Sequence, residues 1–126
     1  MITILLFIVA GFFNSIMDSI RFCWSSSIFS KIKNWKLIKF CNPNGSQGNK
    51  WKNGDKKQDE KFFGSSTFLV WTTDLWHLVK AFMILCLVLG TVTYSVIINP
   101  IVDAIILYLA FTITFEVFFS YIWIKK

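Results

Sequence analysis

The sequence predicts an all-α integral membrane protein with three transmembrane helices, an outside N-terminus and an inside C-terminus. Residues 81–102 carry no charged side chain, and a helix of about 20 residues, rising about 1.5 Å per residue, spans the hydrocarbon core of a bilayer. Two more apolar stretches flank this run, before residue 21 and after residue 99. Charged residues make up only 16% of the chain, against about 25% in soluble domains, so the composition also indicates a membrane protein.

The first expected element is a transmembrane helix over residues 1–20. This stretch has no positively charged start, and no A-x-A-like cleavage signal follows it. We therefore interpret it as a retained helix and not as a secretory signal. Asn14 and Asp18 are four residues apart and share a helical face, with Arg21 almost one turn further on.

The second expected element is a basic, aromatic loop over residues 21–65 at the cytoplasmic surface. Ten of the 13 basic residues lie between Arg21 and Lys61 against three acids, so ten minus three gives this segment a charge of +7. A basic surface can bind nucleic acid, but between two apolar spans anionic lipid headgroups explain it more simply, and nucleic acid is not expected. The residues expected at the membrane interface are Arg21, Trp35, Lys36, Lys39, Trp51, Trp71 and Trp76.

The third expected element is one long helix over residues 66–98, with an interfacial start followed by the second transmembrane helix. Ser66 and Thr67 are candidate N-caps. No glycine or proline interrupts the chain from Phe68 to Leu89. A helix of this length exceeds the thickness of the hydrocarbon core, so its first turns are expected in the headgroup layer.

The fourth expected element, residues 99–126, is the third transmembrane helix with a short basic tail. Asn99 is placed to cap the helix, Pro100 occupies the first helical position, and Asp103 lies in the first turn. These three residue types favour the N-terminus of a helix because they satisfy free N–H groups or complement its dipole.

The placement of lysine and arginine predicts the orientation. The basic loop and the Lys125-Lys126 tail are expected in the cytoplasm, because positive residues accumulate on that side. The N-terminus, without a basic side chain, is then outside, and three spans connect these positions consistently. We expect the bacterial inner membrane, with anionic headgroups in contact with the basic loop.

Six polar residues interrupt the apolar segments, and we treat them as a candidate polar intramembrane cluster in the cytoplasmic half of the bilayer. Ionisable side chains in a span are costly and usually face a bundle interior or a cavity, but ordinary interfacial pairing also explains them. The cluster consists of Asn14, Asp18, Asp74, His77, Lys80 and Glu116.

A sharper interpretation of this cluster is a catalytic or metal site. Asp74 can orient His77 as a general base, and Asp18, Asp74, His77 and Glu116 are candidate ligands for a divalent metal or a proton site. With one histidine and three cysteines without a C-x-x-C pair, a zinc cluster has too few soft ligands. No resident cofactor is predicted beyond that metal.

A small or polar stripe follows one face of the third span. It is suited either to close helix packing or to lining a pore in an oligomer, where Glu116 would favour cations. In span count, size, expected orientation and basic tail, the chain resembles the phage holins with three spans, although its basic loop is longer. The stripe consists of Ala104, Tyr108, Thr112, Glu116 and Ser120.

The sequence contains no motif that specifies a reaction. The leading functional prediction is therefore a small non-enzymatic membrane protein that acts by self-association, or as an accessory subunit or adaptor of a larger membrane protein. An oligomeric, holin-like pore is the second prediction. A membrane enzyme or a metal or proton site using Asp18, Asp74 and His77 is the third.

Overall fold

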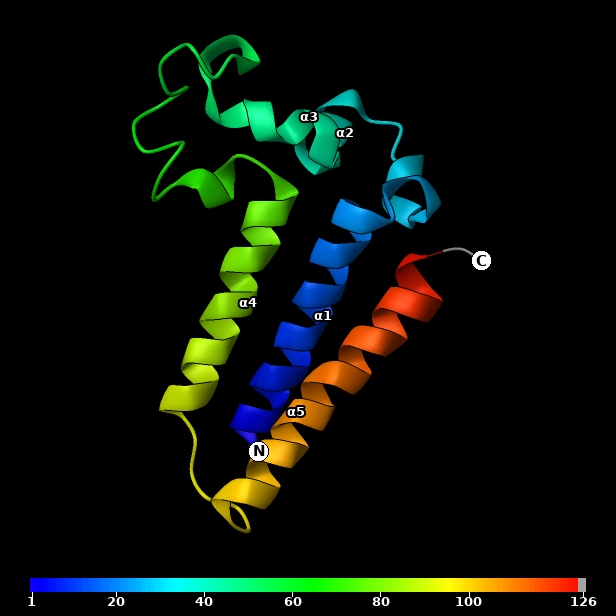
Figure 1. Cartoon of the computed structure of the whole chain (residues 1–126), viewed down its shortest axis with the longest axis vertical. Helices are drawn as coiled ribbons and strands as arrows, with labels where there is room; N and C mark the ends of the chain where they lie inside the picture. Colours follow the sequence, from blue (N-terminus) through cyan, green and yellow to red (C-terminus); the bar gives the residue numbers. More distant parts are fainter. Residues whose placement is uncertain (125–126) are drawn as a thin grey trace.

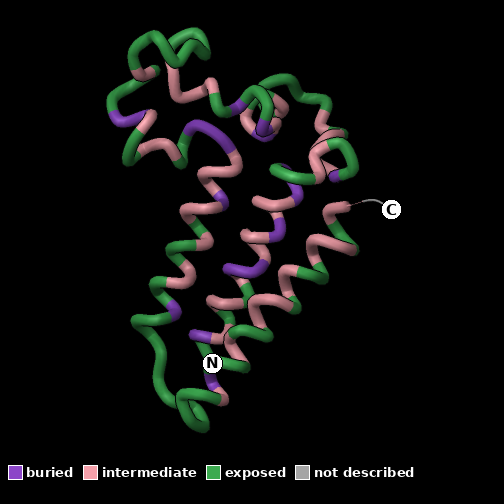
Figure 2. The backbone as a smooth tube through the Cα atoms, viewed as in Figure 1, coloured by how far each residue is buried: buried purple, intermediate pink, exposed green. Residues whose placement is uncertain are grey.

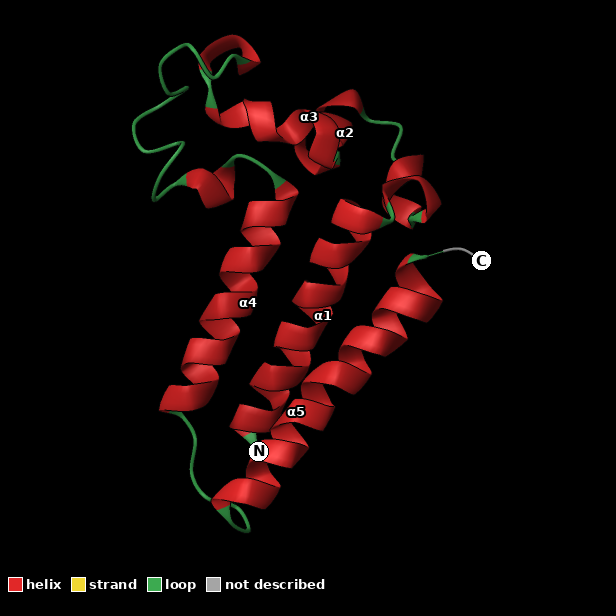
Figure 3. Cartoon of the chain, viewed as in Figure 1, coloured by secondary structure: helices red, strands yellow, loops and turns green. Residues whose placement is uncertain are grey.

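The computed structural model describes residues 1–124, and within that range all named elements are helical (Figure 3). The long helices are α1 (Ile2–Phe22), α4 (Leu75–Val92) and α5 (Pro100–Val117), which continues as the π-helical turn η6 (Phe118–Trp123). Short helical pieces connect α1 to α4. They are η1 (Trp24–Ser26), η2 (Ile28–Lys31), α2 (Trp35–Cys41), α3 (Pro43–Ser46), η3 (Gln47–Lys50), η4 (Lys52–Gly54) and η5 (Val70–Thr72).

Three helices are long and apolar enough to cross a membrane: Ile2–Phe22, Leu75–Val92 and Pro100–Trp123. The predicted all-α class and the three apolar helices are thus confirmed. The first helix runs two residues beyond the predicted boundary at residue 20, and Arg21 falls in its last turn.

Helix α1 lies between α4 and α5, and the segment from residue 24 to residue 73 forms a head over one end of the bundle (Figure 1). The end of η6 lies beside this head, whereas the N-terminus and the α4–α5 connection lie at the other end. Contacts of α1 with α4 and with α5 dominate the tertiary packing. Helix α1 is therefore the central helix of the bundle.

Burial in the three long helices is concentrated on α1 (Figure 2). Its buried positions are mostly small, and α4 and α5 present large apolar side chains outward along most of their length. Such an arrangement would be unstable for a helix bundle in water, because wide apolar surfaces would stay hydrated. It suits a bilayer, where lipid chains cover those surfaces and close contact between small residues joins the helices.

The predicted helix over residues 66–98 is shorter in the structure, and its start is wrong by nine residues: α4 begins at Leu75. The carboxylate of Glu60 accepts hydrogen bonds from the backbone N–H groups of Gly64 and Ser66, and also from the Ser66 hydroxyl. These bonds hold the predicted N-cap region in turns. Asp74 caps α4 instead, with its side chain accepting from the His77 N–H.

The predicted end of this helix is also wrong, because α4 stops at Val92 and not at residue 98. Asp103 accepts hydrogen bonds from the N–H groups of Ile97 and Ile98 at 2.8 and 3.1 Å. Because these N–H groups bond to the carboxylate, they do not donate to backbone carbonyls four residues earlier, as they would in a helix. The start of α5 is as predicted, with the Asn99 side chain accepting from two backbone N–H groups, Pro100 in the first turn and Asp103 behind it.

A small hairpin-like pairing organises the head. Lys52 N–H donates to the Asp59 carbonyl, and Lys61 N–H donates to the Lys50 carbonyl, each at 3.0 Å. The turn includes Asn53 and Gly54 in the left-handed region, at φ 53° and 76°. Only residues that tolerate positive φ suit these two positions, which is why Asn-Gly is found there.

Candidate functional site

A seam of small residues on α1 brings α1 and α5 into backbone contact. Gly11, Ser15 and Ser19 are spaced by four residues and are all buried. A Cβ atom at Gly11 would lie 2.4 Å from the carbonyl oxygen of Phe111, so only glycine permits this approach. The indole Nε1–H of Trp123 donates to the Ser15 hydroxyl at 2.8 Å.

This α1 seam was not among the predicted functional residues. Its signal in the sequence is the spacing G-x-x-x-S-x-x-x-S, a small-residue repeat typical of membrane helix interfaces. The repeat identifies α1 as a packing helix, but it does not identify which of the other two helices it contacts.

The seam between α1 and α4 uses larger side chains. Phe13 stacks on Phe82 with ring centroids 5.4 Å apart, and the Phe7 ring lies over Gly90, where a Cβ would come within 2.9 Å of it. At the end away from the head, the Thr3 hydroxyl donates to the Thr93 carbonyl at 3.2 Å.

The stripe predicted on the third span is not the face that α5 packs on α1. That face contributes Phe118 and Trp123, whose rings lie 4.9 and 5.8 Å from Phe12. In the stripe, Tyr108 is 66% exposed and Glu116 is exposed, with its carboxylate accepting from the Ser120 hydroxyl. The single chain therefore carries a carboxylate on an outer, largely apolar surface.

Asp74 and His77 form a hydrogen-bonded pair at the start of α4, next to the head. Asp74 is 1% exposed; its Oδ1 accepts from the His77 backbone N–H at 3.0 Å, and its Oδ2 lies 2.7 Å from His77 Nδ1. The Thr73 hydroxyl lies 3.2 Å from Oδ2. Since Asp74 accepts these hydrogen bonds, Nδ1 is the donor, and Nε2 is the imidazole nitrogen left for other contacts.

The remaining members of the polar intramembrane cluster are spread over α1, α4 and α5. The ammonium of Lys80 sits 4.8 Å from the centroid of the Trp76 ring. Asn14 and Asp18 are half-buried on α1, whereas Glu116 is on α5, across α1 from α4 (Figure 1).

Within residues 1–124, no group of three histidine, cysteine or carboxylate side chains gathers as a metal site. The four candidate ligands are thus not assembled around one point in this structure. Asp74 and His77 remain the two that are in contact, and the predicted metal or proton chemistry stays a prediction.

The residues predicted at the membrane interface lie in the head or at the helix ends beneath it. Trp35 is exposed at the start of α2, with the Lys36 ammonium 5.8 Å from its ring centroid. Lys39 is tied in through its carbonyl, which accepts from the Asn49 side chain at 2.9 Å. Arg21 and Trp71 are exposed, and Trp51 and Trp76 are half-buried.

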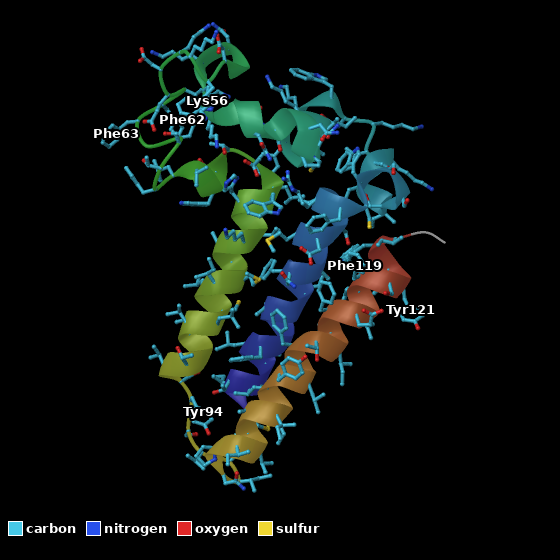
Figure 4. All side chains as sticks on the ribbon, in the orientation of Figure 1. Lys56, Phe62, Phe63, Tyr94, Phe119 and Tyr121 are labelled. Atoms are coloured by element: carbon cyan, nitrogen blue, oxygen red, sulfur yellow. The ribbon has the colours of Figure 1, made fainter. Side chains whose placement is uncertain are left out.

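Exposed phenylalanines add to this aromatic surface beside the start of α4. Phe63 is 84% exposed and its ring contacts Phe68 at 5.7 Å between centroids. In Figure 4, Phe63 projects away from the head, while Lys56 lies in the part of the head furthest from the helices. Aromatic side chains at this level are typical of the headgroup layer of a bilayer.

At the opposite end, Asp103 organises the connection between α4 and α5. The Tyr94 hydroxyl donates to Asp103 Oδ2 at 2.9 Å (Tyr94 is labelled in Figure 4). Desolvation, the hydrogen bond to Asp103 and the charge of that carboxylate raise the pKa of Tyr94 above its ordinary value. Asp103 was predicted as a helix-start residue, but its capture of the connecting loop follows only from the structure.

Comparison with known proteins adds no further constraint. No family model, no curated protein and no solved structure matches the chain.

Proposed function

We propose that the protein is a non-enzymatic integral membrane protein of the bacterial inner membrane that acts by self-association. In the proposed orientation, the head and the C-terminal end of η6 face the cytoplasm, and the N-terminus and the α4–α5 connection face outward. The charge of +7 between Arg21 and Lys61 supports this orientation. The position of the head at one end of three alternating helices is compatible with it (Figure 1).

The outward position of Glu116 is the observation that carries the proposal. A carboxylate in the interior of a membrane helix costs about 2.5–3.5 kcal/mol when lipid surrounds it. Glu116 lies on α5 seven residues before Trp123, and its carboxylate accepts a hydrogen bond from the Ser120 hydroxyl on the same helix. A second copy that covers this face would remove the carboxylate from lipid and supply it with polar neighbours.

The stripe on α5 gives the second copy a surface to pack against. Ala104, Tyr108 and Glu116 are exposed along one side of the helix, and small and hydroxyl residues allow membrane helices to approach closely. The same exposed face also supports the second candidate function, a pore. Several copies with Glu116 turned toward a common axis would form a cation-selective path.

An accessory role beside a larger membrane protein remains compatible with the same exposed face. A catalytic role is supported only by the Asp74–His77 contact, which is 2.7 Å long and fixes the imidazole tautomer. We rank it third because Asp74 also caps α4, a structural task that accounts for the pair.

Cysteine crosslinking in liposomes tests self-association through α5. In a background with Cys23, Cys41 and Cys86 replaced by serine, Tyr108→Cys is expected to yield disulfide-linked dimers on oxidation. Leu85→Cys, which is 50% exposed on α4, is the matched control and is expected to stay monomeric. Monomers from both variants at every protein-to-lipid ratio, or dimers only from Leu85→Cys, would contradict the proposal.

Ion flux separates the pore from a closed assembly. Liposomes with the wild-type protein are compared with Glu116→Gln liposomes of equal protein content and verified crosslinking. Flux that depends on Glu116 establishes the pore, and crosslinked dimers without flux establish a closed assembly.

Orientation has its own test. A membrane-impermeant maleimide should label Lys56→Cys in inside-out vesicles and Val96→Cys in right-side-out vesicles, and the reverse pattern would overturn the proposed topology.

A further inference from the structure

A small cavity with two cationic side chains in its lining lies where the head meets the ends of α1 and α4. Its volume is about 230 Å³, and it is lined by Arg21, Gln47, Lys50, Trp76 and His77. These residues come from the last turn of α1, from η3 and from the first turn of α4. Clefts that bind drug-sized ligands have volumes of about 300–1,000 Å³. The smaller volume of this cavity suits a small group such as a lipid headgroup.

The cavity is positively charged, and its cations lack protein counter-ions. Within residues 1–124, the ion pairs are Lys52–Asp59 and Asp74–His77. The guanidinium of Arg21 and the ammonium of Lys50 therefore have no carboxylate partner in the described part of the chain. The Lys50 ammonium does lie 6.0 Å from the centroid of the Trp51 ring, but that contact leaves its charge without a counter-ion. Two cations from separate elements that lack a carboxylate partner and line one cavity are favourable for a bound anion.

The walls of the cavity are held in place by hydrogen bonds on both sides. The Asn49 side chain donates to the Lys39 carbonyl at 2.9 Å and to the Thr73 carbonyl at 3.1 Å, which ties η3 to the residue before Asp74. The Lys50 carbonyl accepts from the Ser65 hydroxyl at 2.7 Å. The backbone positions that carry Gln47 and Lys50 are thus set opposite the first turn of α4.

His77 and Trp76 complete the cavity from α4. Asp74 holds His77 through Nδ1–H, so Nε2 faces a ligand as a hydrogen-bond acceptor in the neutral tautomer, which suits the hydroxyl of a monoprotonated phosphate group. Asp74 itself does not line the cavity, and it is already engaged with the His77 N–H and ring. The Trp76 ring also contacts the Lys80 ammonium, which lies 4.8 Å from its centroid.

We propose that this cavity binds a phosphate group, with Arg21 and Lys50 as the charged donors and Gln47 and His77 as polar neighbours. The planar guanidinium of Arg21 can donate two parallel hydrogen bonds to phosphate oxygens, and Lys50 supplies a compact second charge. In the proposed orientation, the cavity lies at the cytoplasmic headgroup layer. The phosphate can therefore belong to an anionic lipid or to a free phosphate species in the cytoplasm.

This inference rests on the membrane insertion and orientation proposed above, but not on self-association. The full-length protein is placed in nanodiscs of phosphatidylcholine in which about one fifth of the lipid is phosphatidic acid. This content supplies an anionic headgroup while most of the bilayer stays uncharged. Native mass spectrometry after transfer to detergent then counts the phosphatidic acid retained. A second arm measures binding of inorganic phosphate to the protein in pure phosphatidylcholine nanodiscs.

The variants are Arg21→Gln and Lys50→Gln, with Lys56→Gln as the matched control. Lys56 is an exposed head lysine outside the cavity (Figure 4), so the control removes the same charge. Loss of a hydrogen bond to a charged group is expected to weaken binding about tenfold in each cavity variant. Lys56→Gln should change it less than about twofold, because an exposed charge is screened.

Selective loss in the phosphatidic acid arm assigns the site to a lipid headgroup, and selective loss in the inorganic phosphate arm assigns it to a free phosphate. Equal losses in all three variants, or no binding in either arm, would overturn the proposal. Lys50→Arg retains the charge and should retain binding. Binding by this variant would show that position 50 tolerates substitution, so that loss in Lys50→Gln is due to the missing charge and not to misfolding. Glu116→Gln should leave phosphate binding unchanged, whether or not this variant still forms dimers. A failure of self-association can therefore be distinguished from a failure of phosphate binding.

Discussion

Replacing Gly11 with alanine tests the contact between α1 and α5. The added Cβ would lie 2.4 Å from the Phe111 carbonyl oxygen, about 1 Å short of the 3.4 Å at which ordinary contact begins. Because the obstructing atom is backbone, relief requires the two helices to separate. A separation of that size would also stretch the 2.8 Å bond between Trp123 Nε1 and the Ser15 hydroxyl beyond hydrogen-bond range.

The magnitude follows from these two effects. Overpacking of this kind costs about 1–3 kcal/mol, and a lost hydrogen bond costs about 1 kcal/mol more. The higher helix propensity of alanine returns up to about 1 kcal/mol. The lost hydrogen bond and the gain in helix propensity offset each other, so the overpacking cost remains. We expect Gly11→Ala to lower the free energy of unfolding by about 2 kcal/mol, the middle of the overpacking range.

The measurement is unfolding in mixed micelles by titration with SDS, followed by far-UV circular dichroism. Gly45→Ala is the matched control, since a Cβ there meets nothing within 4 Å. It is expected to stay within about 0.5 kcal/mol of the wild type. Equal stability of the two variants would refute the close approach of α1 and α5.

Three further predictions concern polar groups that the fold places. Trp123→Phe removes the donor to Ser15 and should cost about 1 kcal/mol in the same SDS titration; no loss would contradict that bond. Asp103→Asn weakens the acceptor that holds the loop and should speed hydrogen exchange at Ile97 and Ile98 by about tenfold, measured by NMR. Unchanged exchange would mean that the loop does not depend on the carboxylate. Tyr94, whose pKa is raised by desolvation and by Asp103, should ionise above the ordinary tyrosine range in an absorbance titration near 295 nm. Asp103→Asn should lower that pKa part of the way, because desolvation, the larger cause, remains. Because its folded-state pKa is raised, its contribution to stability is present below the ordinary value and is lost as pH rises through the folded-state value.

The last prediction concerns Glu60, which holds the turn before α4. Hydrogen bonds from the Ser66 hydroxyl, the Gly64 N–H and the Ser66 N–H lower the pKa of Glu60. Its contribution to the order of the head is therefore present above the ordinary glutamate value and is lost as pH falls through the lowered one. Glu60→Gln should increase exchange at Gly64 and Ser66 at neutral pH, and protection equal to the wild type would contradict this role.

The amino-acid sequence by itself determined the three apolar helices and the start of the last one. Hydrophobic length and helix capping are local properties: a run without charge is readable along the chain, and Asn99, Pro100 and Asp103 act on the backbone within a few residues of themselves. The composition of the head could be read in the same way, because clustered lysine and aromatic residues are visible without knowledge of their neighbours.

The tertiary structure alone decided where α4 begins and ends. Candidate caps at Ser66 and Thr67 satisfy the local rules, but Glu60 captures the N–H groups around them. At the other end, Asp103 withdraws Ile97 and Ile98 from the helix. Competition for a backbone N–H by a carboxylate four to six residues away depends on the path of the chain, and local propensity does not contain that path.

The faces of the helices were likewise decided by packing. A stripe of small and polar residues on the third span predicts a contact face, yet the close contact forms at Gly11 and Ser15 of α1. In the stripe, Ala104, Tyr108 and Glu116 are exposed. Both stripes satisfy the same rule for close approach. Only the arrangement of α1 between its two neighbours distinguishes the face used within the chain from the face left exposed. The cavity of Arg21, Lys50 and His77 has the same origin, because its residues are far apart in sequence and meet only when the head folds over the bundle.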